Sequence, residues 1–172
     1  DDNLRKNVQH ILDRADSVIV MTNNAADILL RDYTTTKDKI AVIPHGTHLV
    51  PHADKAELKQ KYGFEGRKVL STFGLLSSGK SIETTLDALP AVVDKSPEVL
   101  FLIIGKTHPT VVLHEGEQYR ESLVQKIQKL GLEENVKFIN KYVPLHELLD
   151  YLQMTDIYLF TSKDPNQAVS GT

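Results

Sequence analysis

Residues 68–81 read KVLSTFGLLSSGKS, an apolar run that leads directly into a loop with two glycines and a lysine. The run at 68–73 has the length and composition of a buried strand. The glycines at 74 and 79 predict a turn, and apolar residues at helical spacing then predict a helix over 81–93. A strand, a glycine-bearing loop and a helix in this order begin a β-α-β unit, so this stretch predicts an α/β fold.

The same alternation of strands and helices continues on both sides of this stretch. Toward the C-terminus we predict strands at 99–104, 136–139 and 157–160, and helices at 117–130 and 145–152. Toward the N-terminus we predict helices at 7–14, 25–32 and 55–62, and strands at 17–21 and 40–43. We expect a loop at 105–109, Asn23 or Asn24 as the N-cap of the helix at 25–32, and Gly131 as the end of the helix at 117–130.

The predicted strands at 68–73, 99–104 and 157–160 are largely apolar on both faces, which is typical of parallel sheets covered by helices on both faces. We therefore expect residues 55–172 to form a Rossmann-like, doubly wound parallel sheet. We expect residues 1–44 to be the last β-α-β unit of a second Rossmann-like domain, and the His- and Pro-rich stretch 45–54 to be a linker. Because the chain stops at Thr172 soon after a strand, we expect the sheet to be incomplete at that end.

The composition is that of an ordinary globular protein. The chain has 172 residues, of which 41% are hydrophobic and 25% charged, and its formal net charge of -3 comes without a basic cluster, so nucleic acid is not an expected partner. It has no cysteine, which excludes disulfides and thiolate metal sites. No apolar run approaches the roughly 20 residues that cross a bilayer, and the N-terminus lacks the apolar segment of a signal peptide. We expect a cytoplasmic protein.

Residues 74–81, GLLSSGKS, match the phosphate-binding pattern G-x-x-x-x-G-K-[ST]. Lys80 would add a full positive charge, and the N–H groups at the start of the helix at Ser81 would favour an anion. Ligands of doubly wound sheets bind outside the carboxyl ends of the strands, which is where this loop is expected to lie.

Three interpretations of this loop remain open. A P-loop nucleotide hydrolase would need an aspartate after a neighbouring strand to help hold Mg²⁺. The strands at 99–104 and 157–160 are followed instead by Gly105-Lys106 and Thr161-Ser162, with Asp164 nearby. A second interpretation is a tight turn with a solvated lysine. The pattern most favours the third, an anionic ligand bound without the rest of a hydrolase.

Five segments, in order along the chain, resemble motifs of the group 1 (family 4) glycosyltransferases. Residues 40–46 (IAVIPHG) resemble I-x-V-I-P-N-G-V-D, and residues 73–89 (FGLLSSGKSIETTLDAL) resemble G-R-L-x-x-x-K-G-x-x-x-L-I-x-A. Residues 102–105 (LIIG) resemble L-x-I-V-G, residues 136–143 (VKFINKYV) resemble V-x-F-x-G-x-V, and residues 145–157 (LHELLDYLQMTDI) resemble E-L-x-x-Y-x-x-A-D-I. Each motif alone is weak, whereas the ordered set is specific.

The resemblance implies the sugar-donor-binding half of a two-domain (GT-B) transferase. Such an enzyme moves a hexosyl group from a nucleoside-diphosphate sugar to an acceptor with retention, and needs neither a metal nor another cofactor. The implied diphosphate site is Gly74, Ser77 and Lys80. The implied nucleotide site is Gly105, Lys106, Asn140, Lys141, Tyr142 and Val143, and the implied sugar and ribose loop holds Asp164, Asn166 and Gln167.

The resemblance also leaves parts of the enzyme unassigned. Catalytic residues on the acceptor side belong to the other domain in this family, so we expect the chain not to turn over alone. The acceptor, a glycan, a lipid or a small molecule, is unknown, and contact with a membrane surface is expected only through the remainder of that domain.

Two departures from the family pattern bear on function. Leu75 stands where the family has an arginine, and the loop at 162–172 holds Asp164 but lacks the second glutamate of the family's E-x₇-E motif. A degenerate, non-catalytic interaction domain therefore remains an alternative. His45, His48 and His52 are interpreted as solvated linker side chains, since no helix aligns them for zinc.

Overall fold

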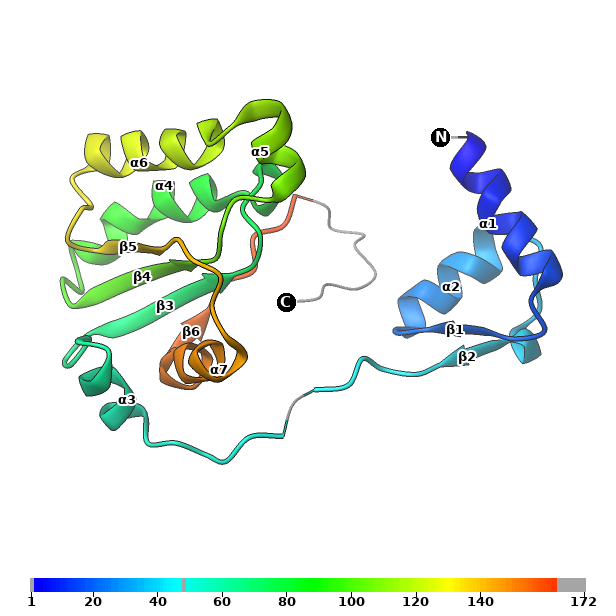
Figure 1. Cartoon of the computed structure of the whole chain (residues 1–172), viewed down its shortest axis with the longest axis horizontal. Helices are drawn as coiled ribbons and strands as arrows, with labels where there is room; N and C mark the ends of the chain where they lie inside the picture. The colour runs from blue at the N-terminus through cyan, green and yellow to red at the C-terminus, as the bar shows by residue number, and fades with distance from the viewer. Residues whose placement is uncertain (1, 48, 164–172) are drawn as a thin grey trace. The chain divides into compact units, whose positions relative to one another are not determined.

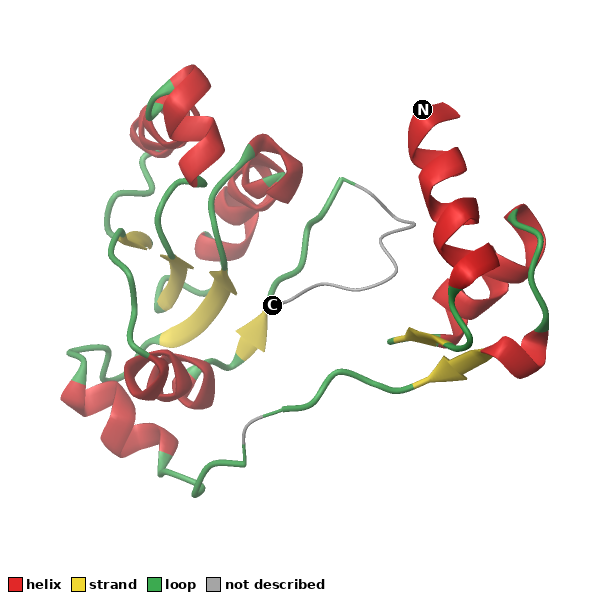
Figure 2. Ribbon diagram, turned by 45° about the vertical axis from the view of Figure 1, so that its right-hand side comes forward, coloured by secondary structure: helices red, strands yellow, loops and turns green. Residues whose placement is uncertain are grey.

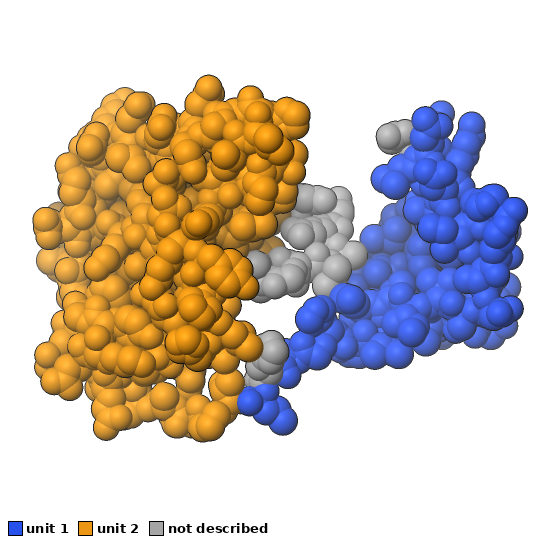
Figure 3. Space-filling model, in the orientation of Figure 1, with its two compact units in different colours: residues 1–49, 166–171 blue, residues 50–165, 172 orange. Residues whose placement is uncertain are grey.

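The structure is a computed structural model that describes residues 2–47 and 49–163. The chain divides into two compact units, one ending at residue 49 and the other beginning at residue 50, which Figure 3 colours separately. No helix in the described ranges is long and apolar enough to cross a bilayer.

The first unit is a single β-α-β motif preceded by a helix, as the alternation predicted. Its elements are α1 (Asp2–Arg14), β1 (Val18–Val20), α2 (Asn23–Asp32), the 3₁₀ helix η1 (Lys37–Lys39) and β2 (Ile40–Val42). The two strands pair in parallel, with Ile19 opposite Ala41. The predicted caps of α2 are corrected: Thr22 is the N-cap, and its hydroxyl accepts the N–H of Ala25 at 3.1 Å. A threonine oxygen there does what an asparagine oxygen would do one residue later.

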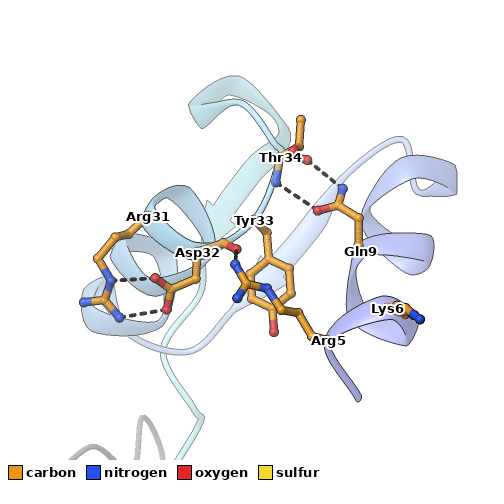
Figure 4. A pocket seen from close by; sticks show the side chains of 7 residues that line it. All are labelled: Arg5, Lys6, Gln9, Arg31, Asp32, Tyr33 and Thr34. Carbon is orange, nitrogen blue, oxygen red and sulfur yellow. Dashed lines mark hydrogen bonds and ion pairs between the residues drawn. The ribbon is translucent and has the colours of Figure 1, made fainter. Parts of the chain in front are cut away.

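A hollow of about 480 Å³ lies in this unit between α1 and the segment that follows α2 (Figure 4). The amide of Gln9 exchanges two hydrogen bonds with the backbone of Thr34, at 2.9 and 3.0 Å, and Arg5 donates to the carbonyl of Asp32 at 2.8 Å. These bonds satisfy backbone groups at and just after the end of α2. They hold α1 against α2, and the hollow lies along this contact. Its lining residues are Arg5, Lys6, Gln9, Arg31, Asp32, Tyr33 and Thr34.

The second unit is built on a four-stranded parallel sheet in the order β5-β4-β3-β6. Its strands are β3 (Lys68–Phe73), β4 (Val99–Ile104), β5 (Val136–Ile139) and β6 (Ile157–Tyr158). The first three have the predicted bounds. β6 ends two residues before the predicted bound, because its last ladder bond is that of Leu159 N–H to the Ser71 carbonyl.

Helices cover both faces of this sheet (Figure 1), and Figure 2 shows the same layers from another side. α4 (Ile82–Val93) and α6 (Gln118–Leu130) pack on one face, and α3 (Lys55–Lys61) and α7 (Leu145–Met154) pack on the other. Gly131 ends α6 in the left-handed conformation, as predicted. The doubly wound α/β fold is confirmed.

The helix α5 (Pro109–Glu115) was not predicted. The predicted loop at 105–109 ends at Pro109, and no helix is predicted between it and residue 117. Here Pro109 occupies the first turn, where its missing N–H costs nothing and its fixed φ suits a helix. The following stretch therefore divides into α5 and α6 at Gly116.

The core of the sheet is β4, all six residues of which are buried. Phe101 and Ile103 pack against α4 and α6, whereas Leu102 and Ile104 pack against α3 and α7. Because the side chains of β4 point alternately into two apolar layers, its sequence is a continuous apolar run, and this run is the pattern that predicted the strand.

The order of the strands contains a reversal. From β3 the chain adds β4 and then β5 on one side, and α7 then returns it to the other side of β3, where β6 pairs. In open α/β sheets, ligands bind in the crevice at such a switch point. The loops that follow β3 and β6 flank that crevice here.

Asp156 fastens β6 to β3. One carboxylate oxygen accepts the N–H of Val69 at 2.8 Å and the ammonium of Lys59 at 2.5 Å, and the other accepts Lys55 at 3.1 Å. Its own N–H donates to the Val69 carbonyl at 2.8 Å. Burial alone would raise the pKa of Asp156, but the bonds from Lys59, Val69 and Lys55 outweigh it and lower that pKa below its usual value.

The junction between β3 and α4 contains a strained residue. The 3₁₀ turn η2 (Ser78–Lys80) leads into Ser81, which has φ 47° and ψ 41°. It is the one residue other than glycine at positive φ in the described parts of the chain, and its side chain makes no capping bond. A left-handed conformation costs a non-glycine residue roughly 1–2 kcal/mol.

Asp156→Asn is expected to lower the free energy of unfolding by about 1–2 kcal/mol at pH 7, the range for hydrogen bonds to a charged group after allowance for partial exposure. A lowered pKa adds stability above the ordinary carboxyl pKa of about 4, and this stability is lost as pH falls through the lowered pKa. The gap between wild type and variant should therefore narrow below about pH 4. Urea denaturation at pH 7 and pH 3 measures it. Glu133→Gln, on an exposed loop, is the control, and a gap independent of pH would contradict the assignment.

Ser81→Gly is expected to raise stability by up to about 1 kcal/mol, because the relief of strain exceeds the entropy that glycine adds to the unfolded chain. Ser81→Val should cost more than about 2 kcal/mol, since a β-branched residue tolerates positive φ worst. Thermal denaturation of both variants checks this. Ser122→Gly, within α6, should instead destabilise by about 0.5–1 kcal/mol, and equal losses for the two glycine variants would refute the strain.

Candidate functional site

The loops at the carboxyl ends of β3 and β4 run side by side. Gly74 N–H donates to the Ile104 carbonyl at 3.0 Å, and Leu76 N–H donates to the Lys106 carbonyl at 2.8 Å. His108 N–H returns a bond to the Leu76 carbonyl at 2.9 Å. The parallel ladder therefore continues past the strands and holds the Lys80-bearing loop against its neighbour.

Two glycines make this approach feasible. Gly74 and Gly105 have φ of 133° and 127°, and a Cβ placed on Gly105 would collide with the Gly74 carbonyl. The family resemblance implies that Gly74 lies in the diphosphate site and Gly105 in the nucleotide site. The close approach in the structure is between Gly74 and Gly105, and contact of either with a ligand stays a prediction.

Lys80 is a partly buried cation without a matching anion. Its Nζ lies 3.4 Å from the Phe73 carbonyl, and no carboxylate within residues 2–47 and 49–163 forms an ion pair with it. Burial lowers the pKa of Lys80 because it penalises the charged form. A buried cation normally has a partner, so a ligand anion would relieve this cost.

At the start of α4, three N–H groups in the region where an anion is predicted to bind are bonded within the protein. The N–H groups of Lys80 and Ser81 close the 3₁₀ turn onto Ser77 and Ser78, at 3.0 and 3.2 Å. The N–H of Ile82 donates to the hydroxyl of Tyr119 at 3.2 Å. These three N–H groups are bonded within the protein, and anion binding at the helix N-terminus stays a prediction.

The unbonded N–H groups lie one turn earlier. In the described chain, those of Ser77, Ser78 and Gly79 donate to no protein acceptor. These N–H groups, the hydroxyls of Ser77 and Ser78 and the Lys80 ammonium are donors on this loop that could bind an anion. The same geometry disfavours the P-loop interpretation, because a P-loop directs the N–H groups around its lysine at phosphate.

Tyr119 and Glu83 form a hydrogen-bonded pair at the N-terminus of α4. The Tyr119 hydroxyl donates to Glu83 at 2.7 Å, and burial together with this carboxylate raises the pKa of Tyr119. Burial would raise the pKa of Glu83, yet the bonds from Tyr119, its own N–H and Lys163 lower it overall. Glu83 therefore remains a carboxylate beside the candidate site.

The loop after β6 is fastened to the loop that carries Lys80. The Thr161 hydroxyl donates to the Lys80 carbonyl at 2.7 Å, and the Lys163 N–H donates to the Gly79 carbonyl at 3.0 Å. The Lys163 ammonium lies 3.6 Å from Glu83. These contacts bridge the switch point, and the sequence offered no pattern that would reveal Tyr119, Thr161 or Lys163 as members of the site.

The loop after β5 lies next along the same edge. Lys141 forms an ion pair with Glu147 at 2.6 Å, and the residue Tyr142 is 84% exposed. Asn140 is also exposed, whereas the side chain of Val143 is buried in the core under α7. A ligand at Val143 would therefore meet backbone.

The predicted site residues divide into three groups. Gly74, Ser77 and Lys80 lie on the loop after β3, and Gly105 and Lys106 lie on the adjoining loop after β4. The residues 140–143 occupy the next loop along the edge. The remaining predicted residues, Asp164, Asn166 and Gln167, lie outside the described residues, as does His48 of the histidine-rich linker. Elsewhere, in the part of the chain that the structure describes, no three metal-ligating side chains cluster.

Two proteins compared with the chain are similar over nearly all of it. Mannosylfructose-phosphate synthase of Agrobacterium fabrum is 28% identical over 94% of this chain and 36% of its own length. The crystal structure of HepE of Anabaena in complex with UDP-glucose superposes with a TM-score of 0.73 and 25% identity, over 96% of this chain and 43% of that one.

A third protein shares the fold. Sucrose-phosphate synthase of Thermosynechococcus elongatus superposes with a TM-score of 0.71 and 21% identity, over 94% of this chain and 39% of that one. The chain thus spans well under half the length of these proteins. The family model of glycosyl transferases group 1 matches residues 54–168. With that match over two thirds of its length, the chain belongs to the group 1 glycosyltransferases.

Proposed function

We propose that the protein to which this chain belongs transfers a hexosyl group from a nucleoside-diphosphate sugar to an acceptor, with retention. In this proposal the second unit binds the sugar donor at the edge formed by the loops after β3, β4 and β5. The observation that carries it is Lys80, a partly buried cation without a carboxylate partner in the described chain, at the switch point of a doubly wound sheet.

The chemistry needs stabilisation of the departing diphosphate. As the bond from the sugar carbon to the phosphate oxygen breaks, negative charge grows on that oxygen and an oxocarbenium-like centre forms. A cation held in place before the reaction stabilises this charge without reorganising. Lys80 and the free N–H groups of Ser77 to Gly79 would supply that stabilisation.

The nucleoside would lie farther along the same edge. The exposed ring of Tyr142 offers a face on which a base can stack, and Gly105 and Lys106 adjoin the diphosphate loop. Asn140 and Lys141 would contribute polar contacts. The HepE structure contains UDP-glucose, so UDP is the first probe to use.

Several further properties belong to the same proposal. We propose that donor binding requires no metal, that the protein is cytoplasmic and that the acceptor is bound mainly by residues outside this chain. On that basis the chain binds a nucleotide but does not turn over by itself. Unchanged UDP binding after addition of EDTA would support the metal-free proposal, and loss of binding would reject it.

Lys80→Ala is expected to weaken UDP binding by roughly tenfold to a hundredfold, because hydrogen bonds to charged groups contribute about 1.5–3 kcal/mol. Calorimetric titration with UDP, GDP, ADP and ATP, with and without Mg²⁺, measures this and identifies the base. Lys95→Ala, at the opposite end of α4, removes the same charge and should leave affinity unchanged.

Each other outcome of this titration has a definite meaning. Tight binding of ATP or GTP only with Mg²⁺ would replace the proposal by a nucleotide hydrolase. Absence of binding by all four nucleotides would reject it and favour an interaction domain, for which the exposed Leu75 in the phosphate loop would be the motivating feature.

Tyr142→Ala is expected to weaken UDP binding by about five- to tenfold, since stacking of a base on an aromatic ring contributes about 1 kcal/mol or more. The ring is exposed, so the melting temperature should not change. Tyr142→Phe keeps the stacking face and should bind as wild type does. Equal weakening by Phe and Ala would contradict stacking and indicate a role for the hydroxyl.

A further inference from the structure

We propose that Lys163 is the second cation that binds the diphosphate of the sugar donor, opposite Lys80, and that Glu83 holds it when the site is empty. The inference rests on the proposed function and assigns a role to a residue that no sequence motif identifies. It follows from charge, from the position of the loop after β6 and from the weakness of one ion pair.

The charge of the ligand calls for more than Lys80. A nucleoside diphosphate carries at least two negative charges at neutral pH, and enzymes that bind such groups surround them with several cations and N–H groups. Leu75, the exposed residue that begins the same loop, contributes no charge. A second cation must therefore come from another loop.

Lys163 is the lysine whose backbone lies across the switch point. Its N–H donates to the carbonyl of Gly79 at 3.0 Å, and Gly79 is the residue directly before Lys80. Of the other lysines at this edge, Lys141 is paired with Glu147 at 2.6 Å, and Lys106 follows β4, away from the crevice between β3 and β6. The long, flexible side chain of a lysine lets its ammonium move several ångströms while the backbone stays fixed.

The ion pair that now holds Lys163 is loose. Its ammonium lies 3.6 Å from Glu83, whereas the other ion pairs in the described chain measure 2.5 to 3.1 Å. Glu83 also accepts the hydroxyl of Tyr119 and its own N–H. It would keep both bonds if Lys163 turned away, so release of the lysine leaves no unsatisfied carboxylate.

Thr161 is the positioning residue for this arrangement. Its hydroxyl donates to the Lys80 carbonyl at 2.7 Å, so that two bonds, from Thr161 and from Lys163, join the loops on either side of the crevice. Loss of the hydroxyl removes no charge from the site. It would nevertheless let the two lysines separate, which lowers the preorganisation on which diphosphate binding depends.

The test is UDP titration of the 172-residue chain and its variants at low and at moderate salt. Lys163→Ala should weaken UDP binding by about three- to tenfold and reduce its salt dependence, because one screened charge contact is lost. Lys163→Arg should restore binding to within about twofold. Glu83→Gln as a single substitution should strengthen UDP binding. The same substitution should change UDP affinity less when Lys163 is already alanine, since the two side chains are coupled.

Thr161→Val should weaken UDP binding with little change in salt dependence, and Thr161→Ser should restore it. Lys68→Ala is the matched control, because Lys68 also loses a surface ion pair, with Glu98, but lies at the other end of β3. An equal loss of affinity in Lys68→Ala would overturn the inference by showing a general charge effect. Unchanged affinity in Lys163→Ala, together with a loss in Lys80→Ala, would overturn the inference and leave the proposed function standing. Absence of UDP, GDP and ADP binding by wild type would overturn both.

Discussion

The burial of β4 on both faces is the constraint on which the second unit depends. All six of its residues are buried, so each face of the sheet needs its own helical layer. Each connection between parallel strands must therefore return over a face of the sheet, which places α4 and α6 on one face and α7 on the other, where α3 also packs. With both faces covered, the carboxyl edge is the part of the sheet that stays open to a ligand.

That edge is organised by backbone contacts more than by side chains. The collision that a Cβ on Gly105 would cause with Gly74 shows how closely the first two loops approach. On the other side of β3, Asp156 fixes the register of β6 by bonding to the N–H of Val69. That register determines where Thr161 and Lys163 meet the Lys80 loop. A carboxylate at one end of a short strand thus positions groups at its other end.

The departures of the chain from its family pattern have physical consequences. Ser81 occupies the position of a glycine in the family motif, and it adopts the positive φ that a glycine would adopt without strain. Leu75 takes the position of an arginine and leaves Lys80 as the single cation of its loop. Strain and an unbalanced charge at the same loop are expected where ligand binding, rather than stability, has shaped the chain.

The sequence alone determined the strands β3, β4 and β5 to the residue, because strands buried between two helical layers are largely apolar and end at glycine or polar loops. It also determined the fold class, the family and the loop that bears Lys80, since these depend on local patterns in order along the chain. It did not predict α5, because proline is compatible with the first turn of a helix as well as with a loop.

The tertiary structure decided which groups of the Lys80 loop are free to bind a ligand and which residues surround them. The prediction placed the anion on the N–H groups at the start of α4, but Tyr119, 37 residues away in sequence from Ile82, occupies one of them. The bond from Thr161 likewise joins it to a residue 81 positions away in the sequence, Lys80, and the bond from Lys163 reaches Gly79. Such contacts depend on where α6 and β6 pack, and packing depends on the whole chain. Local pattern specifies each element and its loop, whereas the partners of a loop are chosen only when the elements meet.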